Sequence, residues 1–303
     1  MQANTLSIII VSYNAKEYLQ KAIDSIFRSP PEFQFEVIVV ENNSTDGSLE
    51  MLRSLENDLK IISLHKTVGF SEANNIGAKE ALGEHVLFLN PDTEIIRDAL
   101  SVLVKEMDKH PQLGALSCQL LNADGTIQPQ GGSLPNLFKI FLWMFFIDDL
   151  PFVSSLFLPY QQRNSSFFTK KQKTGWIGGT AFLMRSDEFR KFGAWDSDIF
   201  LYGEDVEFCI RLQKQGKEIG FIPEAKIIHH QHKSTGGSSR SLKGEFEGML
   251  YIWKKHFPAW QLSFLRLILF IGAWLRVLIF GILLHDETRK NTYLEIQKTI
   301  AKA

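Results

Sequence analysis

The sequence predicts an α/β fold built on a doubly wound, mostly parallel sheet. Short apolar runs rich in Ile, Val and Leu recur through the first 120 residues, and helical or turn-rich stretches separate them. Polar residues gather directly after several of these runs. The 303 residues can bury a large core, and a net charge of -1 gives no electrostatic reason to expect nucleic acid as a partner.

The elements follow in order from the residue patterns. Residues 6–11 predict a buried strand, and Asn14 with Glu17 predicts a capping box that begins a helix with one apolar stripe. A short helix is expected after the turn-rich stretch 41–48, and an amphipathic helix is expected to open at Gly203-Glu204-Asp205. Further strands are expected at 35–40, 60–64, 85–89, 113–120, 181–184 and 225–228, and further helices at about 71–81 and 97–109.

Three polar clusters follow the first, second and fourth expected strands. They are Ser12-Tyr13-Asn14, Glu41-Asn42-Asn43-Ser44 and Asn90-Pro91-Asp92. Ligands bind outside the carboxyl ends of the strands in such sheets, so these clusters predict the binding edge. The first turn lacks the glycines of a dinucleotide site, and the sequence has no phosphate loop of the NTPase type. These features suggest a nucleotide-diphosphate sugar, with its base and ribose at Glu41 and its diphosphate at a metal held by Asp92.

Six segments in this order resemble the successive motifs of the family 2 glycosyltransferases, which have a GT-A fold. They are SIIIVSYNA, VIVVENNSTDGS, VGFSEANNIGA, LFLNPDT, GWIGGTAFLMRSDEFRKFGAWDSDIFLYGEDVEFCIRL and IIHHQHKSTG. The combination is similar to the rhamnosyltransferase-type branch and covers roughly residues 5 to 240. The resemblance implies an inverting sugar transfer from a nucleotide-diphosphate sugar, with rhamnose from dTDP-rhamnose as the expected donor, to a glycan acceptor.

By this resemblance, one set of residues contacts the donor. Glu41 stands where the family more usually has Asp, and by itself it could equally be a solvated loop acid or a helix-cap partner. Asp46 is interpreted as shaping its loop. The segment with Asn75 and Gly77 passes near the nucleotide or serves helix packing. The expected donor contacts are Ser12, Tyr13, Asn14, Glu41, Asn43, Asn75 and Asp92.

The resemblance also implies a divalent cation, Mg²⁺ or Mn²⁺. Asp92 occupies the place of the second acid of the family's D-x-D motif, and Asn90 replaces the first. His229 and Ser234 match an H-x-x-x-x-S arrangement in which the histidine ligates the metal, and the glycines that follow could close a loop over the donor. The alternatives are an Asx turn in which Asp92 caps the next helix, and an ordinary surface or core histidine.

Catalysis is assigned by resemblance to Asp205, as the general base that deprotonates the acceptor. Glu204 would hold the acceptor or the loop, or could itself be the base, although acids in a first helical turn commonly just complement the helix dipole. Trp176, Gly178 and Gly179 are expected to line the acceptor pocket. The two glycines would equally suit a plain turn.

The C-terminal part suggests contact with a membrane surface. Residues 262–284 are apolar and long enough to span a bilayer, but Arg266 and Arg276 interrupt them. With Trp260 and Trp274, this pattern favours a helix lying in the interface, and a helix packed on the protein body is the alternative. The aromatic run 138–157 could be a second contact. A lipid-linked acceptor at the cytoplasmic face of the cell membrane would explain both stretches.

The resulting organisation is a nucleotide-sugar half (1–120), an acceptor and catalytic half (121–240) and a membrane-associated helical tail (241–303). Cys118 and Cys209 are expected to be buried thiols, and no export signal is evident. The rival functions are a nucleotidyltransferase, which would need a glycine-rich basic loop after the first strand, and a non-catalytic sugar-nucleotide-binding relative.

Overall fold

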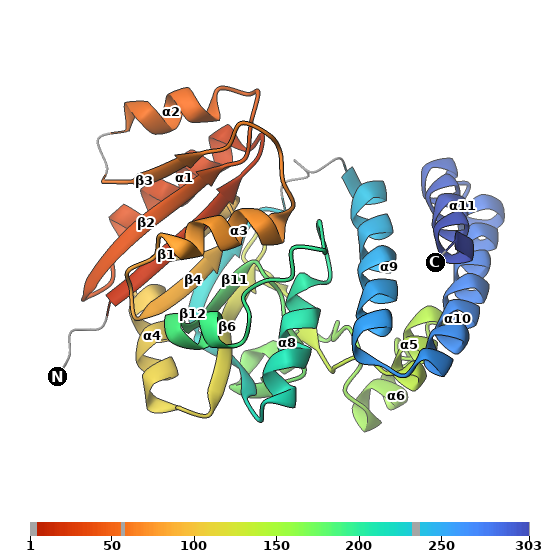
Figure 1. Ribbon diagram of the computed structural model, residues 1–303. Helices are drawn as coiled ribbons and strands as arrows, with labels where there is room; N and C mark the ends of the chain where they lie inside the picture. The colour runs from red at the N-terminus through yellow and green to blue at the C-terminus, as the bar shows by residue number, and fades with distance from the viewer. Residues whose placement is uncertain (1–4, 56–57, 232–236, 303) are drawn as a thin grey trace.

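The computed structural model describes residues 5–55, 58–231 and 237–302. A mixed sheet of ten described strands, with its covering helices, forms the larger part of the molecule. A group of helices, most of them from the C-terminal part of the chain, lies beside it (Figure 1). The mixed α/β architecture with a largely parallel centre confirms the predicted fold class in outline.

The central order of the sheet is β3-β2-β1-β4-β11-β6-β12-β5, and β7 and β9 pair with β6 and β12. β1 runs parallel to β2 and β4, whereas β11 runs antiparallel to β4 and β6. A small second sheet pairs β8 with β10. The strands are β1 (Thr5–Ser12), β2 (Gln34–Glu41), β3 (Lys60–Ser63), β4 (His85–Leu89), β5 (Thr93–Ile96), β6 (Leu113–Leu121), β7 (Ile127–Gln128), β8 (Gly131–Gly132), β9 (Gln172–Thr174), β10 (Trp176–Ile177), β11 (Ala181–Arg185) and β12 (Glu218–His229).

Helices cover both faces of the sheet and build the group beside it (Figure 1). They are α1 (Lys16–Arg28), α2 (Ser48–Ser54), α3 (Phe70–Lys79), α4 (Ala99–Lys109), α5 (Leu137–Met144), α6 (Pro151–Leu156), the 3-10 helix η1 (Ser165–Thr169), α7 (Ser186–Lys191), α8 (Glu204–Lys214), α9 (Gly237–His256), α10 (Ala259–Leu278), the π-helical η2 (Ile279–Leu283) and α11 (Glu287–Lys302).

The strand alternation divides the core between the two faces of the sheet. Ile8 and Ile10 of β1 pack with the apolar stripes of α1 and α4, while Ile9 faces the cluster that includes Phe208 of α8. Because successive side chains of a strand point to opposite faces, a fully apolar run such as β1 requires cover on both sides. This packing fixes the carboxyl ends of β1, β2 and β4 along one edge.

Most of the expected elements lie within a few residues of their predicted bounds, and β4 matches its prediction of 85–89. The capping box of Asn14 and Glu17 is wrong: Asn14 has a positive φ of 49°, and the helix begins after Ala15 without a side-chain cap. The run 225–228 is only the end of the longer β12. β5, which pairs with β12, was not predicted, because its partner is more than 120 residues away in sequence.

The C-terminal helices share a second core with α5 and α8. Trp253, Leu265, Leu269 and Ile296 are among its buried members. One described segment, Ala259–Leu283, is long and apolar enough to cross a membrane by length and composition, which is weak evidence by itself.

The two arginines of α10 face the protein rather than a membrane interface. Arg276 is buried, and its guanidinium donates hydrogen bonds to the backbone oxygens of Met144 (2.5 Å) and Trp143 (3.3 Å). Arg266 donates to the backbone oxygen of Ile300 at the end of α11. The expectation that these arginines mark an interfacial helix is therefore corrected: they bind α10 to its neighbouring helices.

Candidate active site

A cavity of about 1370 Å³ lies where the carboxyl ends of β1 and β4 meet α8 and α9. Its lining brings together Tyr13, Asp92, Trp176, Gly179, Glu204, Asp205 and His229 from the predicted set. These residues span more than 200 positions in sequence. The prediction that the carboxyl edge of the sheet carries a site is consistent with this cavity.

Hydrogen bonds lock the loops after β1 and β2 together. The backbone N–H of Asn14 donates to Ser44 Oγ (3.0 Å), and Asn14 Oδ1 accepts from the backbone N–H of Thr45 (2.8 Å). Asp46 accepts from the backbone N–H of Lys16 at 2.9 Å and so takes the place of an N-cap for α1. Asp46 shapes the loop, as predicted, and Asn14 acts here as a brace between two segments about 30 residues apart.

Glu41 and Asn42 follow one another at the carboxyl end of β2 but differ in their surroundings. Glu41 is buried, and its Oε1 accepts the backbone N–H of Ser44 at 2.7 Å. Asn42, which was not predicted as a site residue, lines the cavity and exchanges two hydrogen bonds with the backbone of Val68. Ser12 is buried beneath the same edge. Asn43 has a positive φ of 62°, and its amide reaches Thr67 Oγ1 at 3.5 Å.

Asp92 and His229 meet at the cavity although 136 residues separate them in sequence. Asp92 Oδ1 and His229 Nε2 are 3.3 Å apart, because β5 and β12 pair and bring Thr93 opposite His229. Ser234 and the loop at 232–236 lie outside the described residues.

Gln128 sets the orientation and tautomer of His229. Gln128 Oε1 lies 2.6 Å from His229 Nδ1, and Gln128 Nε2 donates to Asn122 Oδ1 and to the backbone oxygen of His229. These two bonds favour the amide orientation in which Gln128 Oε1 accepts from Nδ1–H, and in that tautomer of the neutral ring the lone pair lies on Nε2, the nitrogen nearer Asp92.

This pair suits a divalent cation by its chemistry. A carboxylate oxygen and an imidazole lone pair at 3.3 Å repel each other unless a proton or a metal ion lies between them. No group of three His, Cys, Asp or Glu residues that could hold a metal gathers among the described residues. Asp92 and His229 would therefore supply two ligands, and the remaining positions would be open to a diphosphate and water.

Glu204 and Asp205 begin α8 at the wall of the cavity. Asp205 Oδ2 accepts the backbone N–H of Gly179 (3.1 Å), and its Oδ1 accepts the backbone N–H of Val206 (2.7 Å). Glu204 is buried, and its Oε2 has no hydrogen-bond partner among the described residues. Two adjacent acids therefore have different surroundings.

Burial raises the pKa of both carboxyl groups. The pKa of Glu204 rises to about 8, through desolvation first and the neighbouring charge of Asp205 second. Burial also raises the pKa of Asp205, while the backbone donors of Val206 and Gly179 oppose the shift. The backbone donors therefore favour the ionised form at Asp205 more than at Glu204, whose pKa of about 8 favours the protonated form at neutral pH.

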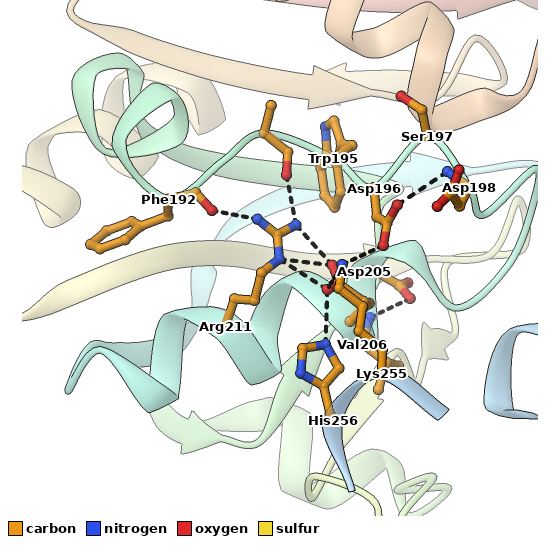
Figure 2. Close-up of polar contacts among 12 residues, drawn as sticks. Phe192, Trp195, Asp196, Ser197, Asp198, Asp205, Val206, Arg211, Lys255 and His256 are labelled. Carbon is orange, nitrogen blue, oxygen red and sulfur yellow. Dashed lines mark hydrogen bonds and ion pairs between the residues drawn. The ribbon is translucent and has the colours of Figure 1, made fainter. Parts of the chain in front are cut away.

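A buried ionic network holds α8 against α9 behind the site (Figure 2). The fully buried Glu207 contacts Arg211 (2.8 Å), Lys255 (2.9 Å) and His256 (2.9 Å). Arg211 also donates to the backbone oxygens of Phe192 and Ala194. Since Asp205 lies two residues before Glu207, this network positions the candidate base.

The remaining predicted residues divide between the cavity and its support. Trp176 lines the cavity, and its indole N–H donates to the backbone oxygen of Tyr160 at 2.7 Å. Gly178 permits close packing, because a Cβ there would lie 2.2 Å from Gln130 Nε2. The Asn75 amide binds the backbone of Trp195 in both directions, so it braces the segment before α8.

Three residues at the site were not predicted from the sequence: Gln128, Gln130 and Tyr160. The Asp124-Gly125 pair, flanked by strand-like residues, is a hairpin signal that could have placed Gln128 beside β6. Gln130 and Tyr160 follow irregular backbone and have no comparable signal.

Comparison with known proteins gives one family. The profile described as Glycosyl transferase family 2 matches residues 7–186. The O-antigen biosynthesis protein RfbC of Myxococcus xanthus is 29% identical over 234 residues, which are 76% of this chain and 17% of that protein. The N-acetylglucosaminyl-diphospho-decaprenol L-rhamnosyltransferase of Mycobacterium tuberculosis is 23% identical over 277 residues, which are 85% of this chain and 87% of that enzyme.

Solved structures share the fold at low identity. GalNAc-T7, crystallised with UDP, GalNAc and Mn²⁺, gives a TM-score of 0.60 at 18% identity, covering 87% of this chain and 54% of that one. The mannosyltransferase PcManGT of Pyrobaculum calidifontis, in complex with GDP-Man and Mn²⁺, gives 0.58 at 17% identity, covering 98% of this chain and 75% of that one.

Proposed function

The chain belongs to glycosyl transferase family 2, and we propose that it transfers a sugar with inversion from a nucleotide-diphosphate sugar to a lipid-linked glycan. The proposed donor is dTDP-rhamnose, and the name of the Mycobacterium tuberculosis relative supports rhamnose as the transferred sugar. The proposed setting is cell-surface polysaccharide synthesis at the cytoplasmic face of the cell membrane.

The proposal rests on one observation: two chemically different groups of residues line the same cavity. Asp92 and His229 lie 3.3 Å apart at the sheet edge, and Asp205 lies on the wall formed by α8. A donor diphosphate suits the first pair, and an acceptor hydroxyl suits the second position. This division is what a direct displacement between two bound substrates requires.

Asp92 and His229 would hold a divalent cation, Mn²⁺ or Mg²⁺, as two ligands of its shell. When bound, such a cation offsets the negative charge that develops on the departing nucleotide diphosphate. Gln128 keeps the His229 ring oriented for this role through the contact at Nδ1.

Asp205 would act as the general base. It takes the proton of the acceptor hydroxyl as that oxygen attacks the anomeric carbon, and the bond from that carbon to the nucleotide diphosphate breaks. The Gly179 and Val206 donors hold the carboxylate in place. Glu204, protonated at neutral pH, can donate a hydrogen bond to the acceptor or to its own loop.

The first experiment is a donor screen with the purified chain, measured as release of nucleoside diphosphate. We expect one donor among dTDP-rhamnose and the common UDP- and GDP-sugars to be consumed with Mn²⁺ or Mg²⁺, and EDTA to stop the release. Asp205→Asn should lower the rate with that donor by about 100-fold or more, which is the usual contribution of a general base.

Asp24→Asn, an exposed acid on α1, is the matched control and should behave like the parent. Consumption of no donor at all would overturn the transferase proposal. An Asp205→Asn variant that matches the parent would overturn the catalytic assignment. Membership of the family favours glycosyl transfer over the nucleotidyltransferase alternative. The same donor screen tests the non-catalytic alternative, because a protein that only binds the sugar nucleotide would consume no donor.

A further inference from the structure

The cavity continues beyond Asp205 into the space between α9, α11 and the segment after α6. Three arginines line this distal part: Arg163, Arg240 and Arg289. They come from the loop before η1, from the first turn of α9 and from the first turn of α11, so only the tertiary structure brings them to one cavity. Three acids of the lining, Asp92, Glu204 and Asp205, lie at the sheet end.

Each arginine whose contacts are described is held at the wall. Arg163 Nη1 contacts both oxygens of Asp149, at 2.6 and 2.7 Å. Arg289 lies with its guanidinium 5.2 Å from the ring centre of Phe280 and its Nε 3.4 Å from Asp286. Guanidinium groups held in this way remain charged and keep further N–H donors for a ligand.

Glu245 of α9 is the one described acid that lines the cavity among these arginines. It accepts a hydrogen bond from Gln161, and its surroundings raise its pKa to about 7 by desolvation, while Arg276 and Arg163 oppose the rise. A group with this pKa takes up a proton easily when another anion arrives. Three guanidinium groups therefore lie around Glu245 in the distal cavity, and Asp149 and Asp286 are the counter-ions of Arg163 and Arg289.

Close packing explains why this part adjoins the candidate base. Gly248 of α9 touches the turn before α8 so closely that a Cβ would lie 2.3 Å from the backbone oxygen of Tyr202. Glu245 lies on the same helix one turn earlier. Glu245 and Asp205 line the same cavity, so one ligand can contact both the distal part and the candidate base.

The outer side of the same region is apolar. Ile282, Leu283 and Leu284 precede Arg289 by a few residues and are 63%, 72% and 60% exposed. The helix α10, which leads into this segment, also has exposed apolar side chains, among them Phe264 and Trp274. A free sugar or glycan would use neither the cations nor the apolar exterior.

We propose that Arg163, Arg240 and Arg289 form an anion subsite that binds the phosphate linker of the acceptor, most simply a diphosphate between the acceptor sugar and an apolar chain. The sugar then lies toward Trp176 and Asp205, and the apolar chain leaves past Leu283 and Leu284. This inference rests on the proposed function and adds to it the residues that recognise the acceptor.

The test measures binding of geranyl diphosphate to the full chain by calorimetry in EDTA, so that no metal holds a diphosphate at Asp92 and His229. The parent should bind this probe. Arg163→Gln and Arg289→Gln should each weaken binding by about tenfold or more, since a hydrogen bond to a charged group contributes about 1.5–3 kcal/mol. Arg190→Gln, on the exposed face of α7, is the matched control and should leave the affinity unchanged.

Two further arms separate the alternatives. Asp92→Ala should leave binding of geranyl diphosphate in EDTA unchanged, and loss of binding there with intact binding in the arginine variants would place the probe in the donor site. The arginine variants should still sediment with phosphatidylglycerol vesicles. Loss of vesicle binding with unchanged probe affinity would assign the arginines to lipid headgroups instead.

An absence of probe binding to the parent at millimolar concentration would also overturn the subsite. The melting temperatures of all variants are compared first, so that misfolding is not read as lost affinity. Because binding is measured without a donor, failure of the donor screen and failure of this subsite give different results.

Discussion

At the scale of single residues, the surroundings of Glu204 and Asp205 distinguish two carboxyl groups that are chemically alike. Asp205 accepts two backbone N–H groups, while Glu204 is buried with one oxygen unpartnered among the described residues. Burial raises the pKa of both, and the backbone donors limit the rise at Asp205. The sequence pair alone is symmetrical, so the preference for Asp205 gains its physical reason from these contacts.

A pH profile tests this division. Because the base must be ionised, kcat/KM should fall as the pH drops through the raised pKa of Asp205, which lies above the ordinary value of 3.8. Glu204→Gln should keep this acidic limb and remove any titration near pH 8, where Glu204 loses its proton.

The comparison variant is Asp205→Asn, which should lose the acidic limb together with most of the rate. A profile in which Glu204→Gln removes the acidic limb instead would exchange the two roles. Since the two groups interact, the fitted values belong to the pair, and the change between variants is the decisive measurement.

At the scale of elements, α8 depends on a buried carboxylate that the resemblance did not single out. Glu207 contacts Arg211, Lys255 and His256. Burial raises its pKa, but these partners outweigh that effect and lower the pKa to about 2. A buried ionic group with several partners is costly to break, because the partners are left unpaired.

Glu207→Gln should therefore destabilise the fold. The pKa of Glu207 falls from an ordinary 4.5 to about 2, which corresponds to about 3 kcal/mol of stability at neutral pH. Because the folded-state pKa is the lower one, this stability is present above about pH 4.5 and is lost as the pH falls toward 2. Urea unfolding at pH 7 and pH 3 measures both effects.

Glu247→Gln provides the control on α9, since that acid is exposed and its contact with Lys243 is 3.8 Å long. Its free energy of unfolding should stay within about 0.5 kcal/mol of the parent. Equal stability of Glu207→Gln and the parent at pH 7 would remove the network from the account of how α8 is held.

At the scale of the whole molecule, the helices beside the sheet leave an apolar surface of α10 uncovered in the described structure. Trp260, Phe264, Leu267, Ile271 and Trp274 recur at helical spacing on α10 and are exposed. The arginines of α10 point the other way, into the protein. An exposed apolar stripe on a helix anchored by its opposite face is typical of contact with a membrane surface.

Replacing Phe264 and Trp274 by Ser should reduce sedimentation with phospholipid vesicles and leave the fold intact, because both side chains are about half exposed. Removal of residues 258–303 is a poorer test, since it would uncover the core shared with α5 and α9. Leu82→Ser is the control, as Leu82 is 86% exposed on the sheet side of the molecule. Unchanged sedimentation of the Phe264 and Trp274 variant would argue against membrane contact through α10.

Local sequence patterns predicted the features that depend on residues close together in the chain. The apolar runs of β1, β2 and β4 require cover on both faces, and the polar residues after them mark the binding edge wherever the strands pair. The motif series led to the family, which the match over residues 7–186 establishes. Asp92, His229 and Asp205 all belong to that motif series, although the sequence does not show that Asp92 and His229 are in contact.

Tertiary structure alone decided the features that join distant segments. The pairing of β5 with β12 brings Asp92 to His229, Gln128 sets the tautomer of that ring, and Asp46 caps α1 from another loop. The side on which the arginines of α10 lie, and the gathering of three others in the distal cavity, also follow from packing. Sequence periodicity describes one element at a time, whereas these contacts depend on how separate elements meet, from about 30 to more than 130 residues apart in the chain.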